Sequence, residues 1–219
     1  MKRKSFYIGV GLLVLFVIWT VAIRFVDVGA IGPQGSKVGF ASLNQTIHNI
    51  TGVHMALYAV TDWLGLVPVC FITGFGILGL CEWISRKSLF KVDHSILALG
   101  IFYIIVMAIY IFFEMFVVNY RPILINGISE GSYPSSTTML VMCVMPTAML
   151  QFDARIKNNG FKKCVNILIL TFIAFMVIGR LVSGVHWFSD IIGGAILSAG
   201  LVMIYHSVCG LEKSSSDKL

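Results

Sequence analysis

The sequence is poor in charged residues. Only 12% of its 219 residues are Asp, Glu, Lys or Arg, whereas a typical soluble domain carries about 25%. Hydrophobic residues make up 58% of the chain, and the mean hydropathy is +0.91. So few charges exclude an ordinary water-facing surface and indicate a membrane protein.

Two other scarcities narrow the possibilities further. The chain has five cysteines, an odd number without paired spacing, which argues against a disulfide framework or a zinc site. It also has no convincing cluster of carboxylates, so we expect neither a metal nor another cofactor. The net charge of +6 suggests nucleic acid at first, but the positions of the charges indicate membrane topology instead.

Six stretches are long and apolar enough to cross a bilayer, which takes roughly 17–25 residues. They cover approximately residues 5–26, 63–84, 96–118, 136–152, 165–181 and 189–208. The first is too long for a signal-peptide core and lacks a small-residue cleavage site, so we expect a retained helix. The sequence therefore predicts an all-α polytopic membrane bundle of about six transmembrane helices.

The predicted bundle forms one domain over residues 1–219. Its parts are a first transmembrane helix (1–28), an outer loop (29–62), a five-helix core carrying the site (63–209) and a polar cytoplasmic tail (210–219). Within the outer loop and its junction, residues 43–64 place apolar side chains at helical intervals. This pattern predicts an amphipathic segment at the membrane surface.

The basic residues predict the orientation of the bundle. With six crossings, twelve of the sixteen Lys and Arg residues fall on the side that holds both termini. By the positive-inside rule this side is cytoplasmic, so we expect a multi-pass protein of the cell membrane. Of the four outer basic residues, Arg24 and Lys37 flank the first helix as interfacial anchors. Arg121 and Arg180 need another explanation.

Polar residues collect at three predicted outer helix ends. They are Arg121 after the third helix, Ser135, Ser136 and Thr137 at the start of the fourth, and Arg180, His186 and Asp190 around the junction of the fifth and sixth. Because a bundle brings these ends together, we predict a single site on the extracytoplasmic side.

The residue types at this site suit a phosphate group. Arg121 and Arg180 offer planar charged forks that bind phosphate oxygens in a bidentate manner. Ser135 and Ser136 stand where a helix begins, and the free N–H groups of a helix start bind anions. The sequence therefore predicts a phosphate-binding site.

A nucleophile is also available at the predicted site. His186 and Asp190 are four residues apart, so on a helix they share one face. Asp190 then accepts a hydrogen bond from one ring nitrogen of His186 and leaves the other nitrogen free to attack phosphorus. We predict a phosphohistidine intermediate that water hydrolyses, with Arg121 and Arg180 stabilising the transferring phosphoryl group.

The order and spacing of these residues resemble the type 2 phosphatidic acid phosphatase superfamily. The motifs of that family are Lys-x6-Arg-Pro, Pro-Ser-Gly-His and Ser-Arg-x5-His-x3-Asp. The corresponding residues here read Glu114-x6-Arg121-Pro122, Pro134-Ser135-Ser136-Thr137 and Gly179-Arg180-x5-His186-x3-Asp190. The resemblance extends from the second predicted helix onwards and implies relatives among lipid phosphate phosphatases and undecaprenyl-pyrophosphate phosphatases.

The first two motifs depart from the family pattern, as does the first residue of the third. Glu114 replaces a lysine, and it either pairs with Arg121 or contacts a cationic group of the substrate. Gly179 replaces a serine that would donate to phosphate, whereas Ser136 in place of glycine still supports a helix start. Thr137 replaces the histidine that the resemblance assigns as general acid, a role that typically contributes ~10²–10⁴-fold.

The sequence thus predicts a membrane phosphatase that acts on a lipid phosphate or an isoprenyl (undecaprenyl) diphosphate, without metal and without a nucleic-acid partner. A diphosphate suffers less from the loss of a general acid, because a phosphate leaving group needs less protonation than an alkoxide. Two alternatives stay open: an impaired relative that only binds lipid phosphates, and a phosphotransferase using the same site. The sequence specifies neither the headgroup nor the oligomeric state.

Overall fold

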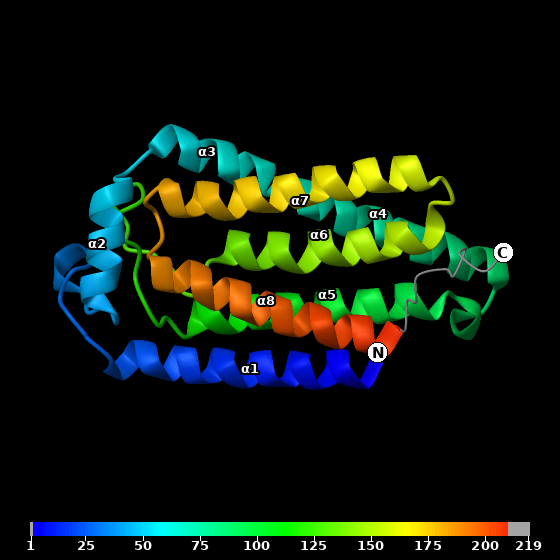
Figure 1. Ribbon diagram of the computed structural model, residues 1–219, viewed down its shortest axis with the longest axis horizontal. Coiled ribbons are helices and arrows are strands. Elements are labelled where there is room, and N and C mark those ends of the chain that lie inside the picture. The colour runs from blue at the N-terminus through cyan, green and yellow to red at the C-terminus, as the bar shows by residue number, and fades with distance from the viewer. Residues whose placement is uncertain (1, 210–219) are drawn as a thin grey trace.

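The protein is seen here as a computed structural model that describes residues 2–209 (Figure 1). These residues form helices and three isolated β-bridges but no β-strand. Six helical stretches among them are long and apolar enough to cross a membrane, so the predicted all-α membrane fold is confirmed. The predicted polar tail, residues 210–219, lies outside the described residues.

The helices along the chain are α1 (Lys2–Phe25), α2 (Ala41–Thr51), α3 (Met55–Leu64), α4 (Leu66–Arg86), α5 (His94–Met115), α6 (Ser136–Arg155), α7 (Asn159–Val182) and α8 (Phe188–Cys209), with 3₁₀ turns η1 (Pro33–Gly35) and η2 (Leu89–Lys91). Most helices follow one another with short connections, but residues 26–40 separate α1 from α2 and residues 116–135 separate α5 from α6.

Local capping chemistry fixes where several helices begin and end. The side chains of Asp93, Ser135 and Asn158 each accept a hydrogen bond from a backbone N–H two or three residues further on, as N-cap residues do. At the other end of α7, Gly184 has φ +70°, a left-handed conformation that glycine adopts at little cost. The turn after α7 therefore starts at a defined point.

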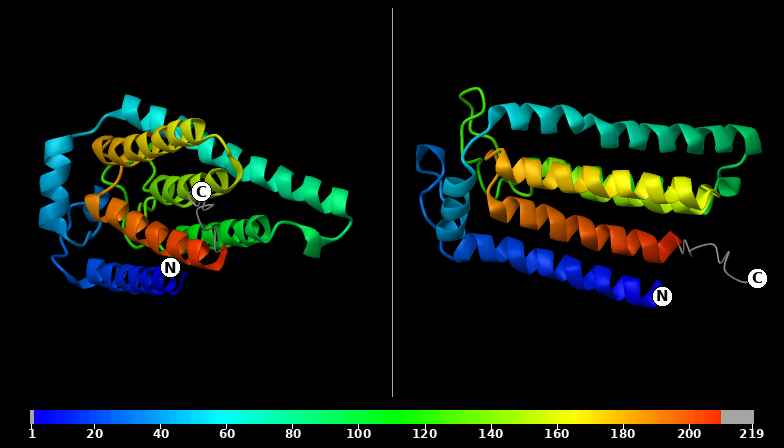
Figure 2. Two further views of the ribbon diagram at one scale, coloured as in Figure 1. Left: turned by 45° about the vertical axis from the view of Figure 1, so that its right-hand side comes forward. Right: turned by 45° about the horizontal axis from the view of Figure 1, so that its top comes forward.

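The outer helices surround α6, which has half of its span buried inside the protein. α6 packs against α4, α5, α7 and α8, while α1 lies along α8 (Figures 1 and 2). The α1–α8 contact is close because both helices have glycine there: a Cβ on Gly9 would stand 2.9 Å from the carbonyl oxygen of Gly200. Small residues allow such close approach between membrane helices.

The outer segment differs from its prediction. Residues 43–64 do not form one surface segment, because Gly52 (φ +69°) ends α2 and the chain restarts as α3. α2 crosses one end of the bundle, whereas α3 packs on α7 and continues into α4 as one span, Met55–Arg86 (Figure 1). The second helical span therefore begins at Met55, and the boundary predicted at residue 63 is corrected.

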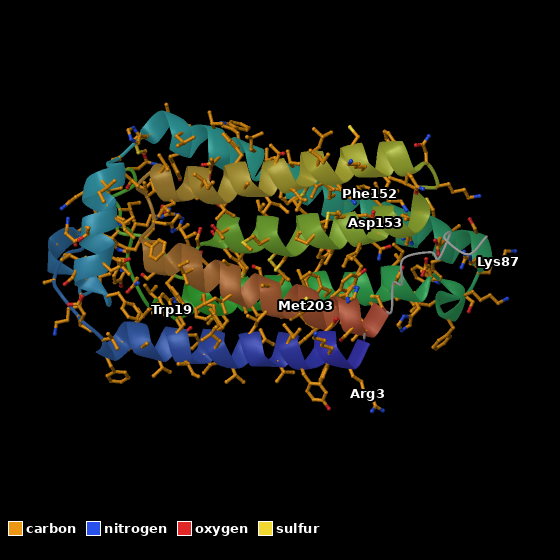
Figure 3. The ribbon with its side chains drawn as sticks, in the orientation of Figure 1. Arg3, Trp19, Lys87, Phe152, Asp153 and Met203 are labelled. Atoms are coloured by element: carbon orange, nitrogen blue, oxygen red, sulfur yellow. The ribbon has the colours of Figure 1, made fainter. Side chains whose placement is uncertain are left out.

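The two ends of the bundle are unlike each other. Arg3 and Lys87 lie at the end where α1 begins and α8 finishes, and Trp19 lies towards the opposite end (Figure 3). We call that opposite end, which carries α2 and the loops 119–132 and 183–187, the site end. All the predicted site residues fall there.

A buried asparagine attaches the outer segment to the site end. Asn44 is fully buried; its Nδ2 donates to the carbonyl oxygen of Gly39 at 2.8 Å, and its Oδ1 accepts from the backbone N–H of Ser189 at 3.0 Å. Since Ser189 is in the first turn of α8, these bonds hold α2 against the helix that follows His186.

Candidate active site

A short hairpin places the first arginine of the site. Asn126 and Gly127 both have positive φ, 50° and 79°, which is the backbone of the tight turn that Asn-Gly favours. The hairpin pairs Ile125 with Ile128 and Tyr120 with Gly131. This folding back brings the chain on either side of the turn together at the site end.

Arg121 links this hairpin to His186. Its side chain is almost wholly buried; Nε donates to Oε2 of Glu130 at 2.9 Å, and Nη1 lies 3.2 Å from Nε2 of His186. A second contact joins Nη1 to the carbonyl oxygen of Val185 at 3.5 Å. Arg121 is therefore held from both sides with its guanidinium beside the imidazole.

His186 lies in the loop between α7 and α8 and not on a helix, so the predicted helical relationship with Asp190 is corrected. The cause is the turn at Gly184, where a Cβ would stand 2.0 Å from the carbonyl oxygen of Gly52. The loop is thus packed directly under the α2–α3 connection. His186 is 3% exposed and α8 starts only at Phe188.

The partners of His186 define its tautomer. Nδ1 lies 3.1 Å from the carbonyl oxygen of Ser132, and a carbonyl only accepts. Nδ1 therefore carries the hydrogen. Nε2 faces Arg121, which only donates, so Nε2 is unprotonated. Burial, reinforced by the positive charges of Arg121 and Arg180, lowers the pKa of His186 well below its usual value, which keeps this nitrogen unprotonated near neutral pH.

Asp190 acts on His186 through the surrounding backbone. Its fully buried carboxylate accepts from Nδ2 of Asn119 at 3.1 Å and from the backbone N–H of Trp187 at 3.0 Å. Its Oδ2 lies 3.9 Å from Nδ1 of His186, which is too long for a hydrogen bond. The structure therefore gives the direct contact with Nδ1 to Ser132, and Asp190 ties down the loop that carries His186.

Arg180 occupies a buried position in the last turn of α7. The side chains around it come from α3: Oγ1 of Thr61 lies 3.4 Å and Oδ1 of Asp62 3.6 Å from its Nη1, and the ring of Tyr58 lies 5.0 Å from its Cζ. Its Nε is buried without a partner among the described residues. An unpaired buried donor needs an explanation, and a ligand oxygen supplies one.

The same helix explains the glycine at position 179. A Cβ on Gly179 would stand 2.8 Å from Cγ2 of Thr61, so the serine of the family motif has no room beside α3. Thr61 is fully buried and its hydroxyl contacts Arg180. The sequence identified the departure at Gly179 but not its cause.

The serines and the threonine predicted at the start of α6 lie in different surroundings. Ser135 is fully buried, and its Oγ accepts from the backbone N–H of Thr138 at 3.5 Å, so it serves as a helix cap. Ser136 lines both the pocket that contains His186 and a neighbouring cavity, and Thr137 lines that neighbouring cavity together with Asp62. Phosphate binding by Ser135 stays a prediction.

Two adjoining spaces open at the site end. The narrow pocket has a free volume of about 10 Å³ and is lined by Glu114, Ser132, Ser136 and His186 among others. The wide cavity has about 300 Å³ and is lined by Asp62, Ser136, Thr137 and apolar side chains. It shares Ile72, Tyr103 and Met107 with an apolar groove of about 510 Å³ between α4 and α5.

Glu114 has no ion-pair partner among the described residues. It is exposed in the last turn of α5. Arg121, one of the two partners considered from the sequence, pairs with Glu130 instead. The pairing of Glu114 with Arg121 is therefore not seen, and contact with a cationic group of the substrate stays a prediction.

Several residues around the site were not found from the sequence. Asn119, Glu130 and Ser132 belong to the hairpin, and the Asn126-Gly127 pair was the signal that predicts its turn. Asp62 was noticed only as part of the amphipathic segment. In residues 2–209, no three His, Cys, Asp or Glu side chains gather as metal ligands.

The sequence and the fold are both similar to those of known proteins. The family model of the PAP2 superfamily matches residues 47–211, more than half of the chain. The structure is similar to that of the transmembrane PAP2-type phosphatidylglycerolphosphate phosphatase from Bacillus subtilis, with a TM-score of 0.62 and 20% identity, over 97% of this chain and 100% of that one. No curated protein matches the sequence. The matched range contains every residue of the predicted site.

Proposed function

Since this chain belongs to the PAP2 superfamily, we propose that it is a membrane phosphatase for lipid phosphates or isoprenyl diphosphates such as undecaprenyl diphosphate. One observation carries the proposal: the unprotonated Nε2 of His186 lies 3.2 Å from Nη1 of Arg121. A phosphate bound by this guanidinium is presented directly to the nucleophilic nitrogen, and such positioning lowers the barrier to attack.

The cradle for the phosphate consists of Arg121, Arg180 and the start of α6. The unpartnered Nε of Arg180 and the backbone N–H groups near Ser136 are donors suited to phosphate oxygens. Both arginines are nearly buried, so their hydrogen bonds to an anion are stronger than in water. These donors stabilise the charge that spreads over the equatorial oxygens during transfer.

The reaction proceeds in two displacements. Nε2 of His186 forms a bond to phosphorus while the bond from phosphorus to the leaving oxygen breaks, and the leaving oxygen takes a proton from water. The resulting hydroxide attacks phosphorus, the N–P bond breaks, and inorganic phosphate leaves with His186 neutral again. The Nδ1–H bond to the Ser132 carbonyl steadies the ring throughout.

The residue expected beside the leaving group, Thr137, favours a diphosphate as the better substrate. Thr137 lines the wide cavity where the family motif has its acid histidine, and a threonine hydroxyl is too weak an acid for that role. A phosphate leaves without full protonation, whereas an alkoxide does not. The apolar groove that adjoins the cavity suits the hydrocarbon tail of either lipid.

The distribution of charge supports an extracytoplasmic site in the cell membrane. Basic residues gather at the end opposite the site, in the first turn of α1 and around the α4–α5 and α6–α7 connections. They include Arg3, Lys4, Arg86, Lys87, Lys91, Arg155, Lys157, Lys162 and Lys163. Such an excess marks the cytoplasmic side, which leaves the site facing outward.

A second candidate is favoured by Thr137 alone. Without the acid histidine, the site binds lipid phosphates through Arg121 and Arg180 but releases little phosphate. Purified protein in detergent, assayed with phosphatidic acid, phosphatidylglycerol phosphate and an isoprenyl diphosphate, decides between the two. Phosphate release above that of His186→Ala supports the phosphatase, and binding without release on every lipid supports the second candidate. Product that forms only with an added alcohol acceptor identifies a phosphotransferase.

A further inference from the structure

We propose that Glu114 binds a protonated primary amine carried by the substrate close to its phosphate. The substrate class is then a lipid phosphate or diphosphate that bears an amine, and this inference rests on the proposed function. The family motif has a positively charged lysine at position 114, and this chain has a negatively charged glutamate. On this proposal the substrate itself carries the positive charge that the lysine supplies in the family.

The position of Glu114 is the first argument. It stands in the last turn of α5 and lines the narrow pocket together with His186. A phosphate attacked by Nε2 of His186 is therefore next to this carboxylate. The two anions repel each other unless a cation lies between them.

The charges of the site leave Glu114 as the uncompensated group. Arg121 is paired with Glu130 at 2.9 Å, and Arg180 has Asp62 at 3.6 Å. No Lys, Arg or His among residues 2–209 lies within ion-pair distance of Glu114. The protein itself thus provides no counter-charge for this carboxylate in the part of the chain described.

The surroundings of Glu114 suit an ammonium group. The side chains of Tyr110, Phe113 and Tyr133 line the same pocket, and the hydroxyl of Tyr110 is in hydrogen-bond contact with the Glu114 carboxylate, which leaves oxygen lone pairs of both groups to accept from an ammonium. A further observation comes from Ser132, which is 3% exposed and lines the pocket, and whose hydroxyl faces the carboxylate of Asp190. Its oxygen is an acceptor for an N–H of the ligand.

The size of the pocket selects the kind of amine. A free volume of about 10 Å³ corresponds to about one water-sized group. A primary ammonium has this size, whereas a trimethylammonium group is much larger. The space beside Glu114 therefore favours a primary ammonium over a choline-type headgroup.

The test compares two matched lipids in detergent: hexadecyl phosphate, and its analogue with an amine on the carbon next to the phosphate-bearing one. We expect wild type to prefer the amine-bearing lipid by about tenfold or more in kcat/KM, since close charge pairs contribute a few kcal/mol when partly desolvated. Glu114→Gln should remove most of this preference. Glu114→Lys, which restores the family residue, should reverse it.

The control is Glu82→Gln, at the opposite end of the bundle, where Glu82 contacts Arg86; it should keep the wild-type preference. Equal kcat/KM for the two lipids in wild type, or an unchanged ratio in Glu114→Lys, would overturn the inference while leaving the phosphatase intact. If neither lipid is hydrolysed faster than by His186→Ala, the proposed function fails instead. The inference is then decided by binding: equal thermal stabilisation of wild type by both lipids refutes it, and stronger stabilisation by the amine-bearing lipid, lost in Glu114→Gln, supports it.

Discussion

Nη1 of Arg121 lies 3.2 Å from Nε2 of His186, although 64 residues separate them along the chain. The hairpin at Asn126-Gly127 positions the arginine, and the Gly184 turn positions the histidine. Two local turns therefore meet in one contact. Because an arginine only donates hydrogen bonds, Nε2 is the acceptor in this contact and carries no hydrogen. We expect its lone pair to become available for attack when the guanidinium turns to a bound phosphate.

The lowered pKa of His186 predicts how stability depends on pH. Burial and the nearby arginines lower this pKa in the folded state, so between pH 6.5 and the folded value only the unfolded chain is protonated there. Folding then loses stability as the pH falls below about 6.5. Between pH 7.5 and pH 5.5 in detergent, we expect the melting temperature of wild type to fall further than that of His186→Asn. Equal losses in the two proteins would contradict the assigned environment.

A lysine should not be able to replace Arg180 in phosphate release. Lysine cannot reproduce a planar fork, so the donor at Nε is lost in Arg180→Lys even though the charge is kept. We expect kcat/KM for phosphate release to fall by about 10²–10³-fold, as for the loss of one donor to a transition-state anion. The matched control is Arg24→Lys, an exposed arginine that donates to the carbonyl oxygen of Val117; its activity should stay within about twofold. A similar twofold effect for Arg180→Lys would remove it from the cradle.

Thr137→His should distinguish the two kinds of leaving group. The new imidazole supplies the acid that the family motif has, which is worth ~10²–10⁴-fold where the leaving oxygen needs a proton. We expect turnover of phosphatidic acid to rise by about 10²-fold, and that of an isoprenyl diphosphate by less than about tenfold. If neither rate changes while the variant keeps its melting temperature, another group already donates the proton.

Gly179→Ser should destabilise the protein because the new side chain meets Cγ2 of Thr61. Overpacking of this kind typically costs about 1–3 kcal/mol. In a Thr61→Ala background the same substitution should cost less, since the obstructing methyl group is gone. Denaturant unfolding of the four proteins gives the coupling energy between the two sites, and a coupling near zero would mean that α3 does not exclude the family serine.

The transmembrane fold was predictable because its signal is strong and local. Apolar runs of about twenty residues are constrained by the bilayer itself, and four of the six predicted spans agree with the structure to within three residues at both ends. The span predicted at 165–181 begins earlier, at Asn159. The span that begins at Met55 was missed in part. Residues 55–64 were assigned to a surface segment, yet α3 packs on α7, and that partner is more than 100 residues away in sequence.

The site was predictable in its residue types but not in its contacts. Arg121, Arg180 and His186 were identified from motif spacing, and the structure brings Arg121 and His186 together. The helical pairing of His186 with Asp190 was wrong in detail, because a positive φ at Gly184 ends the helix before His186. The carboxylates beside the arginines, Glu130 and Asp62, depend on tertiary packing, which motif spacing does not encode.

The central claim is that His186 is the nucleophile, and trapping its covalent intermediate tests this most directly. Purified protein is mixed with a lipid phosphate or isoprenyl diphosphate labelled at the transferred phosphorus, quenched in alkali and digested. We predict an acid-labile, base-stable label on the peptide that contains His186, absent from His186→Ala and reduced in Arg121→Ala. Release of labelled phosphate by wild type with no label on that peptide, or equal release by His186→Ala, would contradict the account.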